Sequence, residues 1–501
     1  MEVLQNESTA TAVAIEPTGS EPLAALKQRA RHSMAALFVR YGLALAIGLV
    51  GTIVLSRLVG PAIWGAFAIA QVVYLSSQEI LGRGIATYLI KQQQSPSADE
   101  IGNTFSLQHL IGTIFLVGAG LFAGPAARWY SHPELVPLLL AAALASYLYA
   151  WRSVPVALLE RELDYVRVAL IEILDATAFS VTAIIFALFG RPILGLAVAT
   201  IARALFSTIA AYVLQPVRPR LRIVRDSLSR IIDFGGFITA CSVLNIVILA
   251  IPALLGGWVV GIANIGQVQM TISLYSNLLF ASAAILRLSF SAYSRIIEYP
   301  GELQRTVSNN LEMAAMVLTP VIVLFAGLSP EWVPLIFGHK WSSLPVLLLT
   351  HASAYWVSAV FWGILSSALV VSGKHRQVFV FLACFVAVYA TFTVFATSRL
   401  GPVGVPLAAS ANHILTYPFL FWICRKPLGK IRLKKVGAEF FCGAVFAGLI
   451  WVSCKYWIGW PILLACLYLA LWYLGNSRSL LSLVQLGRSA FSRPMVAGEE
   501  A

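Results

Sequence analysis

The chain has 501 residues, of which 59% are hydrophobic and only 11% are charged, and its formal net charge is +13 at pH 7. The mean hydropathy is +0.82, whereas soluble globular domains carry about a quarter charged residues. This composition excludes a soluble globular protein and indicates a chain that lies in a lipid bilayer along most of its length. The six cysteines and seven histidines show no metal-binding or redox spacing, so we predict no metal site and no cofactor.

Apolar segments long enough to span a bilayer recur along the chain, because a transmembrane helix needs about 20 mainly apolar residues. The first 33 residues are polar and lack a cleavable signal peptide pattern, so we predict a retained tail. The sequence predicts an all-α membrane protein with about fourteen transmembrane helices, at residues 34–55, 61–86, 102–124, 136–157, 168–189, 193–214, 233–255, 264–290, 309–328, 346–371, 377–398, 403–423, 436–454 and 456–475. Pro461 and the turn at 457–460 leave little length for the last of these spans.

Lys and Arg alternate between the loops that these spans define, and positive charge is retained on the cytoplasmic side. Of the 35 Lys and Arg residues, 24 fall on the side of the N-terminus and 6 on the opposite side, at Arg57, Arg128, Arg191, Lys340, Arg399 and Lys455. The tally predicts that both termini are cytoplasmic. The positive net charge of the chain therefore indicates its membrane topology and does not indicate a nucleic-acid partner. The basic runs 218–230 and 425–435 also suit anionic lipid headgroups.

Spans 1 to 6 can be laid over spans 7 to 12, as in transporters built from two related halves. The matched positions keep their order: Val59-Gly60 and Gly65 with Val260-Gly261 and Gly266, Ala157-Leu158 with Ala368-Leu369, and Gly195, Ala199 and Ala202 with Gly404, Ala408 and Ala411. We predict a cytoplasmic tail at 1–33, a first six-helix lobe at 34–214, a basic linker at 215–232 that forms an amphipathic helix, a second lobe at 233–423, a basic loop and C-terminal helix pair at 424–475, and a cytoplasmic tail at 476–501.

Charged side chains at membrane depth are costly and usually face a cavity or a partner. Several guanidinium groups in one cavity would suit a diphosphate, because Arg pairs bidentately with phosphate oxygens and stays charged. Gln269, Ser273 and Ser276 share one face of span 8, and Gln71, Tyr74 and Gln78 share one face of span 2, which would suit sugars. The predicted substrate-binding residues are Arg40, Arg83, Arg152, Arg203, Arg287, Gln269, Ser273 and Ser276.

Three carboxylates within the spans are candidates for coupling to a cation gradient, namely Glu79, Glu172 and Asp175. A structural interpretation competes with each functional one: Arg152 and Arg203 could pair with Glu172 or Asp175, Arg83 could pair with Glu79, and Arg40 could be an interfacial anchor. The chain has no Gly-rich phosphate loop, no nucleophile elbow and no catalytic acid–base pair in a loop, so we predict no catalytic residue and no enzyme activity.

Four segments carry a resemblance to a known family. Residues 56–68 (SRLVGPAIWGAFA), 82–86 (GRGIA), 159–165 (LERELDY) and 337–341 (FGHKW) resemble polysaccharide transporters of the multidrug/oligosaccharidyl-lipid/polysaccharide exporter superfamily. The likeness runs over about residues 34 to 435 and implies a Wzx-like flippase of the bacterial inner membrane. Such a protein passes an undecaprenyl-diphosphate-linked oligosaccharide from the cytoplasmic to the periplasmic leaflet by alternating access, for exopolysaccharide or lipopolysaccharide biosynthesis. The implied partners are this substrate, membrane lipids, and a polymerase and chain-length regulator.

Three alternatives remain open at this point. A peptidoglycan-precursor (lipid II) flippase also has fourteen spans, and residue chemistry alone does not separate it from the first hypothesis. A cation-coupled multidrug exporter would usually have twelve spans and acidic cavity groups, which five buried arginines disfavour. A membrane polysaccharide polymerase would have a large outside loop, whereas the longest one here, about 329–345, is modest.

Overall fold

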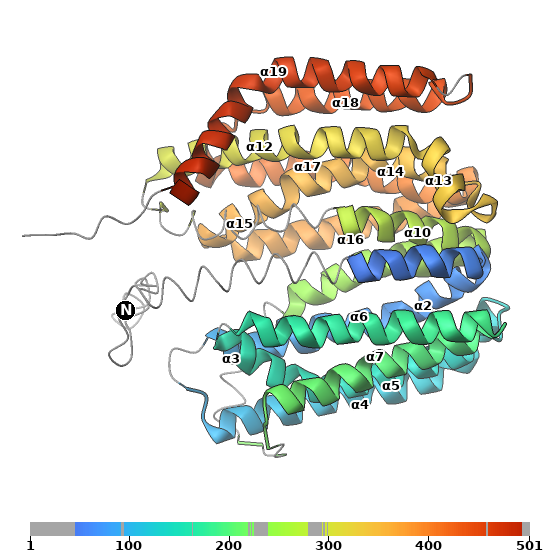
Figure 1. Ribbon diagram of the computed structural model, residues 1–501. Coiled ribbons are helices and arrows are strands. Elements are labelled where there is room, and N and C mark those ends of the chain that lie inside the picture. The colour runs from blue at the N-terminus through green and yellow to red at the C-terminus, as the bar shows by residue number, and fades with distance from the viewer. Residues whose placement is uncertain are drawn as a thin grey trace, which may run out of the picture.

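The computed structural model describes residues 46–91, 95–162, 164–218, 221, 223–224, 239–278, 293, 296–297, 299–456 and 459–492. Over these residues the chain is helical and contains no strand. Its long helices run back and forth along one direction (Figure 1). Ten helical stretches among them are long and apolar enough to cross a membrane. The protein is therefore a multi-pass membrane protein.

The first lobe is a bundle of helices at the N-terminal end of the described chain, coloured blue to green in Figure 1. It consists of Ala46–Leu58, α2 (Pro61–Gln78), the π-helix η1 (Glu79–Ile85), α3 (Ala86–Lys91), α4 (Ala98–Trp129), α5 (Leu135–Arg161), α6 (Tyr165–Leu188) and α7 (Pro192–Leu214). Helix α4 begins with a capping box, in which the Ser97 hydroxyl accepts from the Glu100 amide and the Glu100 carboxylate accepts from the Ser97 amide.

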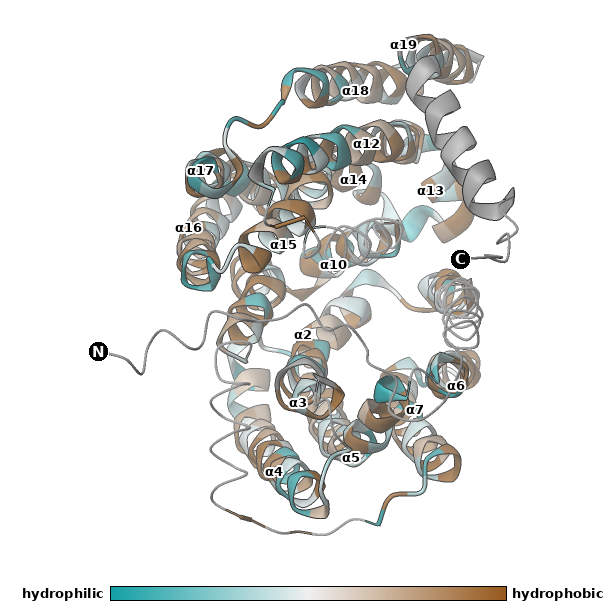
Figure 2. Ribbon diagram, turned by 90° about the vertical axis from the view of Figure 1, so that its left-hand side faces the viewer, coloured by the Kyte–Doolittle hydropathy of each residue, from teal (hydrophilic) through white to brown (hydrophobic). Residues whose placement is uncertain are grey.

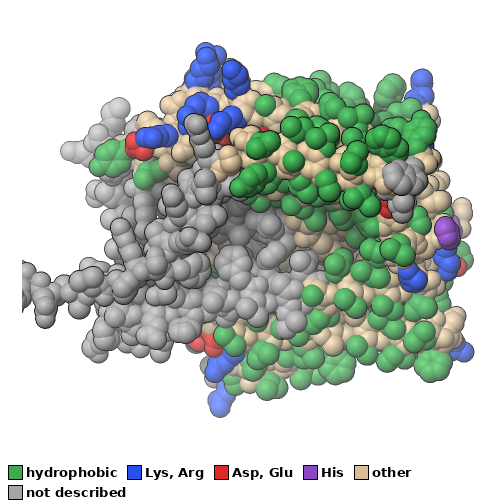
Figure 3. All heavy atoms as spheres, turned by 45° about the horizontal axis from the view of Figure 1, so that its top comes forward, with side chains coloured by type: hydrophobic (Ala, Val, Ile, Leu, Met, Phe, Trp, Pro, Cys, Tyr) green, Lys and Arg blue, Asp and Glu red, His purple; other side chains and the backbone are tan. Residues whose placement is uncertain are grey.

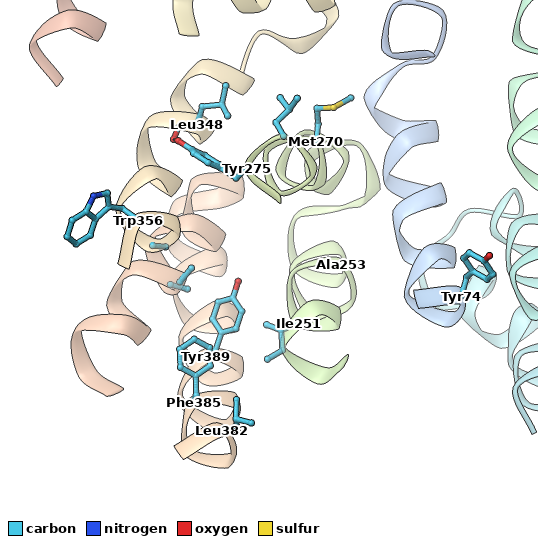
Figure 4. Packing of buried hydrophobic residues seen from close by; sticks show 14 of the residues in the cluster. Tyr74, Ile251, Ala253, Met270, Tyr275, Leu348, Trp356, Leu382, Phe385 and Tyr389 are labelled. Atoms are coloured by element: carbon cyan, nitrogen blue, oxygen red, sulfur yellow. The ribbon is translucent and has the colours of Figure 1, made fainter. Parts of the chain in front are cut away.

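The second lobe begins with the helix Thr239–Val260, which contains the π-helix η2 (Pro252–Gly256) and α9 (Gly257–Val260). It continues with α10 (Ile262–Leu278), α12 (Pro300–Gly327), α13 (Ser329–Phe337), the 3-10 turn η3 (His339–Trp341), α14 (Leu344–Val357), the π-helix η4 (Ser358–Trp362), α15 (Gly363–Val371), α16 (His375–Leu400), η5 (Gly401–Val403) and α17 (Gly404–Leu428). Figure 4 shows its packed interior, where the Tyr275 hydroxyl donates to the Leu348 carbonyl across 2.7 Å.

A final helix pair, α18 (Lys434–Ser453) and α19 (Gly459–Ser492), packs on α12 at the edge of the second lobe (Figures 1 and 2). Gly443 faces Thr319 and Gly327 faces Ile450, and these close approaches allow α18 to lie directly on α12. The Trp472 indole donates to the Met316 carbonyl and ties α19 to the same helix. Pro461 does not shorten the last helix, because it stands in the first turn, where proline is tolerated.

Each of the fourteen predicted spans overlaps a helix of the described chain, the first followed only from residue 46 and the eighth only to residue 278. Most of the observed helices extend past the predicted bounds at one end or both. Helix α12 begins at Pro300 instead of residue 309, and α19 runs on to residue 492 instead of ending near 475. Figure 3 shows hydrophobic side chains along the flanks, with Lys and Arg at the two ends. The membrane prediction and the all-α fold class are thus confirmed.

The linker differs from the prediction where it is described. Residues 215–218, 221 and 223–224 are not helical, and the remainder of the predicted amphipathic helix lies outside the described residues. The Asn103 amide donates to the Val224 carbonyl across 2.8 Å and accepts from the Val224 amide across 2.7 Å. Because one side chain satisfies both backbone groups, the linker lies extended against α4 at this point.

The glycines that defined the internal repeat occupy matching positions in the two lobes. Gly195 on α7 lets that helix approach Phe186 on α6, and Gly404 lets α17 approach Ala396 on α16. A Cβ atom at either position would come closer than 3.0 Å to its neighbour, so both helix hairpins depend on glycine at the same point. The two lobes therefore share a packing device that the sequence match located.

Candidate functional site

The two lobes meet mainly where α2 packs on α10, and this junction lies at one end of the molecule. Gly65 faces the Ile262 carbonyl and Gly266 faces the Pro61 carbonyl, so neither position has room for a Cβ atom. These glycines are the matched pair of the internal repeat. We call this end the closed end, and it contains residues 56–65, 129–135, 254–266 and 329–344. We call the opposite end the basic end, and it contains residues 161–167, 372–376 and 425–435.

Further contacts join the lobes at the closed end. The Arg57 guanidinium donates through Nε to the Ile336 carbonyl across 2.7 Å and also bonds the Leu335 carbonyl. In return, the Trp341 indole donates to the Ser56 carbonyl across 2.9 Å, and Lys340 donates to the Arg57 carbonyl across 3.3 Å. We call these reciprocal bonds the latch. They join two of the segments, 56–68 and 337–341, that carried the family resemblance.

A second set of contacts lies on the other side of the α2–α10 junction. The Tyr130 hydroxyl, just after α4, donates to the Leu254 carbonyl across 2.9 Å. Trp129 and Trp258 pack with their ring centroids 6.0 Å apart. Arg57 lies in the last turn of the first helix of one lobe, and Leu254 and Trp258 lie in the last two turns of the first helix of the other. The matched helices of both lobes therefore contribute to closing this end.

A neutral cavity of about 280 Å³ lies between α2, α10 and the helix Thr239–Val260. Its polar lining groups come from both lobes: Gln71 and Ser76 from α2, and Gln269, Ser273 and Ser276 from α10. The Gln71 amide nitrogen is buried and has no hydrogen-bond partner. Trp64 and Phe67 are among the aromatic and apolar side chains that complete the lining. The structure thus brings together the predicted residues Gln269, Ser273 and Ser276, with Gln71 opposite them.

Three of the predicted charged residues form one ion cluster inside the first lobe. Asp175 on α6 accepts from Arg152 on α5 across 2.9 Å through Oδ1, and from Nε of Arg203 on α7 across 3.0 Å through Oδ2. Arg152 also donates to the Ser207 hydroxyl across 3.0 Å. The Asp175 side chain is only 8% exposed, while that of Arg203 is 24% exposed. Of the two interpretations of Arg152 and Arg203, the structure therefore shows pairing with Asp175.

Aromatic residues enclose this cluster. The Arg203 guanidinium lies 5.2 Å from the Tyr74 ring centroid and 5.3 Å from that of Phe179, and Arg152 lies 5.5 Å from that of Tyr149. Tyr74 points from α2 away from α10 and toward the first lobe (Figure 4). The polar stripe predicted on α2 is thus divided, because Gln71 faces the cavity whereas Tyr74 faces the ion cluster.

The remaining candidates are only partly described. Arg40 and Arg287 lie outside the described residues, and Arg83 is placed by its backbone alone, in the π-helix η1. Glu79 begins the same π-helix, and Glu172 lies on α6 one turn before Asp175. In the part of the chain that the structure describes, no group of three His, Cys, Asp or Glu side chains is placed to hold a metal ion.

Sequence reasoning missed the latch and the enclosure of the ion cluster. Arg57, Lys340 and Trp341 were assigned to outside loops, and nothing in their spacing shows that they meet across about 280 residues. Two residues of the cluster gave a weak signal in the sequence. Ser207 stands four residues after Arg203 on α7, and Tyr149 stands three residues before Arg152 on α5. A search for small polar or aromatic residues at that spacing would have found them.

Comparisons with known proteins agree with this architecture. The chain is 25% identical over 316 residues to the lipopolysaccharide biosynthesis protein WzxC of Escherichia coli (strain K12), covering 61% of this chain and 63% of that protein. It is 22% identical over 306 residues to the succinoglycan biosynthesis transport protein ExoT of Rhizobium meliloti (strain 1021), covering 60% and 61%. The chain thus spans less than two thirds of the length of these relatives.

The fold is similar to that of solved transporters. The lipid II flippase MurJ in an inward closed conformation superposes with a TM-score of 0.67 at 14% identity, covering 90% of this chain and 99% of that one. An inward-facing multidrug resistance MATE family transporter of the MOP superfamily gives a TM-score of 0.55 at 16% identity, covering 80% and 94%. The profile of one family, described as polysaccharide biosynthesis protein, matches residues 54–345. The fold is similar to that of MurJ and of the MATE family transporter, and the chain belongs to this polysaccharide biosynthesis protein family.

Proposed function

We propose that this protein is a flippase that moves an undecaprenyl-diphosphate-linked oligosaccharide from the cytoplasmic to the periplasmic leaflet of the bacterial inner membrane. The observation that carries the proposal is the neutral cavity at the junction of the two lobes, into whose mainly apolar lining both lobes place amide and hydroxyl side chains. The names of WzxC and ExoT, which refer to lipopolysaccharide and succinoglycan biosynthesis, favour a polysaccharide precursor as the substrate class.

The chemistry of the cavity suits sugars. Amide and hydroxyl side chains both donate and accept hydrogen bonds, as the hydroxyl groups of a sugar require. Sites for drug-sized ligands usually measure about 300–1,000 Å³, so a cavity of about 280 Å³ is too small for an oligosaccharide repeat unit. Transport therefore requires the lobes to separate and widen this space, as alternating access demands.

We assign the diphosphate to Arg40, Arg83 and Arg287, because guanidinium groups match phosphate oxygens and retain their charge. Arg152 and Arg203 act indirectly, since their shared bonds to Asp175 hold α5, α6 and α7 together as one unit. Coupling to a cation gradient is assigned to Glu79 or Glu172 in preference to Asp175, whose two oxygens are both engaged by guanidinium groups.

The alternation of positive charge favours a cytoplasmic location for the basic end and for both termini. In this orientation the latch lies on the periplasmic side, and the substrate enters from the basic end. Release into the periplasmic leaflet requires the latch to break. A polymerase and a chain-length regulator would then receive the product.

The test is complementation of polymer export in a strain that lacks the gene. Arg83→Ala and Arg287→Ala should each abolish export while the protein reaches the membrane in normal amount. Arg399→Ala, a change in the last turn of α16, should export normally. Normal export by both test variants would disprove the assignment of the diphosphate. Rescue of a lipid II flippase depletion without any rescue of polymer export would assign the protein to peptidoglycan synthesis instead.

A further inference from the structure

A second concave site lies at the basic end, away from the cavity between the lobes. It is a groove of about 480 Å³ between the first turns of α16 and the last turns of α17. Figure 2 shows that these two helices lie at one edge of the second lobe, whereas α2 and α10 lie in the middle of the molecule. The groove therefore opens to the surroundings of the protein and not to the junction of the lobes.

The mouth of the groove is cationic. Arg376 comes from the start of α16, and Arg425 and Lys426 come from the end of α17. All three side chains are exposed, and no Asp or Glu is among the described residues that line the groove. Three positive charges that share one concave surface without an acidic neighbour attract an anion with more than one negative charge or a cluster of anionic groups.

The floor of the groove is apolar. Trp422 and Phe419 stack with their ring centroids 5.8 Å apart at an interplanar angle of 17°, and Trp422 is 65% exposed. Val380, one turn beyond Arg376, is 41% exposed. Because a helix rises 1.5 Å per residue, the surface changes from cationic to apolar within about 5–6 Å along both helices. Exposed tryptophan next to cationic side chains near the end of a transmembrane helix is typical of the membrane–water interface.

We propose that this groove binds the headgroup of an anionic phospholipid of the cytoplasmic leaflet, such as phosphatidylglycerol or cardiolipin. The phosphate contacts Arg376, Arg425 and Lys426, and the glycerol and first acyl carbons lie on Trp422 and Val380. The volume falls within the range of about 300–1,000 Å³ of small-molecule sites. The phosphate chemistry would also suit the diphosphate of a lipid-linked substrate, but the position of the groove at the edge of the second lobe favours a resident lipid.

The test measures lipid binding to the full-length protein in neutral detergent. Phosphatidylglycerol, cardiolipin and phosphatidylcholine are titrated separately, and bound lipid is counted by native mass spectrometry. Each Lys or Arg near an anionic surface contributes about 1 kcal/mol, or roughly fivefold in affinity. The double variant Arg376→Ala/Arg425→Ala should therefore bind the anionic lipids about 25-fold more weakly than the parent.

The matched control, Arg399→Ala/Lys455→Ala, removes two cations that lie at the C-terminal ends of α16 and α18, away from the groove, and should bind anionic lipid as the parent does. An equal loss in both double variants would show diffuse attraction by net charge and would overturn the proposal, as would equal binding of phosphatidylcholine. Displacement of the bound phosphatidylglycerol by stoichiometric undecaprenyl diphosphate would also overturn it, because the groove would then belong to the substrate.

Discussion

The glycine contact between α2 and α10 offers the sharpest test of how the closed end is held. A Cβ atom at Gly65 would stand 2.0 Å from the Ile262 carbonyl oxygen, whereas real Cβ contacts stay beyond 3.0 Å. Because the neighbour is a backbone atom in a helix, Gly65→Ala must move α2 and α10 apart by about 1 Å or more. Such forced shifts in packed interiors cost about 1–3 kcal/mol.

The same displacement strains the latch. The bond from Trp341 to Ser56 spans 2.9 Å and that from Arg57 to Ile336 spans 2.7 Å, so a shift of about 1 Å takes both beyond hydrogen-bond distance. Two lost bonds cost about 0.5–1.5 kcal/mol each. The closed end should therefore be destabilised by about 2–6 kcal/mol in all, enough to shift a two-state equilibrium strongly toward opening.

The assay is labelling of Ser56→Cys by a membrane-impermeant maleimide added to the periplasmic side. Ser56 is fully buried at the closed end, so the reporter should remain unlabelled in the parent and become labelled in Gly65→Ala. Gly60→Ala is the matched control, because a Cβ there meets no atom within 4 Å. Equal labelling in the two alanine variants, or none in Gly65→Ala, would refute the view that this glycine holds the end closed.

Three further changes follow from the same geometry. Asp175→Asn removes the charge that compensates the buried Arg152 and the half-buried Arg203, and it should destabilise the purified protein by about 3–5 kcal/mol. The control Asp164→Asn keeps an N-cap acceptor and loses only an exposed ion pair, so it should cost less than about 1 kcal/mol. Similar shifts of melting temperature for both variants would contradict the role of the cluster. Gln269→Ala, in the cavity, should raise the substrate concentration needed for half-maximal transport in proteoliposomes without changing melting temperature, and an unchanged concentration dependence would remove this residue from the site. Trp341→Phe keeps an aromatic side chain but loses the indole N–H and its bond to the Ser56 carbonyl, so it should increase periplasmic labelling of Ser56→Cys less than Gly65→Ala does. Labelling that exceeds that of Gly65→Ala would reverse the assigned order of the two contacts.

The sequence alone determined the membrane class, the number of passes and most helix bounds. These features depend on local properties, because bilayer thickness fixes the length of an apolar segment and each helix satisfies its own backbone hydrogen bonds. The last helix shows the limit of such reasoning: Pro461 suggested a short span, but proline in a first turn leaves a helix intact, and α19 reaches Ser492.

The sequence also located the glycines of the internal repeat, although not their purpose. Matching order indicated that Gly65 and Gly266 are equivalent, and only the packed lobes show that they lie against each other at the closed end. Two equivalent helices from related lobes meet at the axis between them, and close contact there requires small residues on both. A repeat in the sequence can therefore indicate which residues are equivalent, but not that they touch.

Only the tertiary structure decided the partners of the buried charges and the latch. Composition placed Arg152, Asp175 and Arg203 within spans, but each lies on a different helix, and the rotation of one helix against another depends on packing along its whole length. Arg57 lies in the last turn of the helix Ala46–Leu58, and Trp341 lies in the 3-10 turn η3. Their segments meet because the rest of the first lobe and the first helices of the second lobe fold between them. Local pattern thus defined what crosses the membrane, while packing between distant helices defined what holds the lobes together.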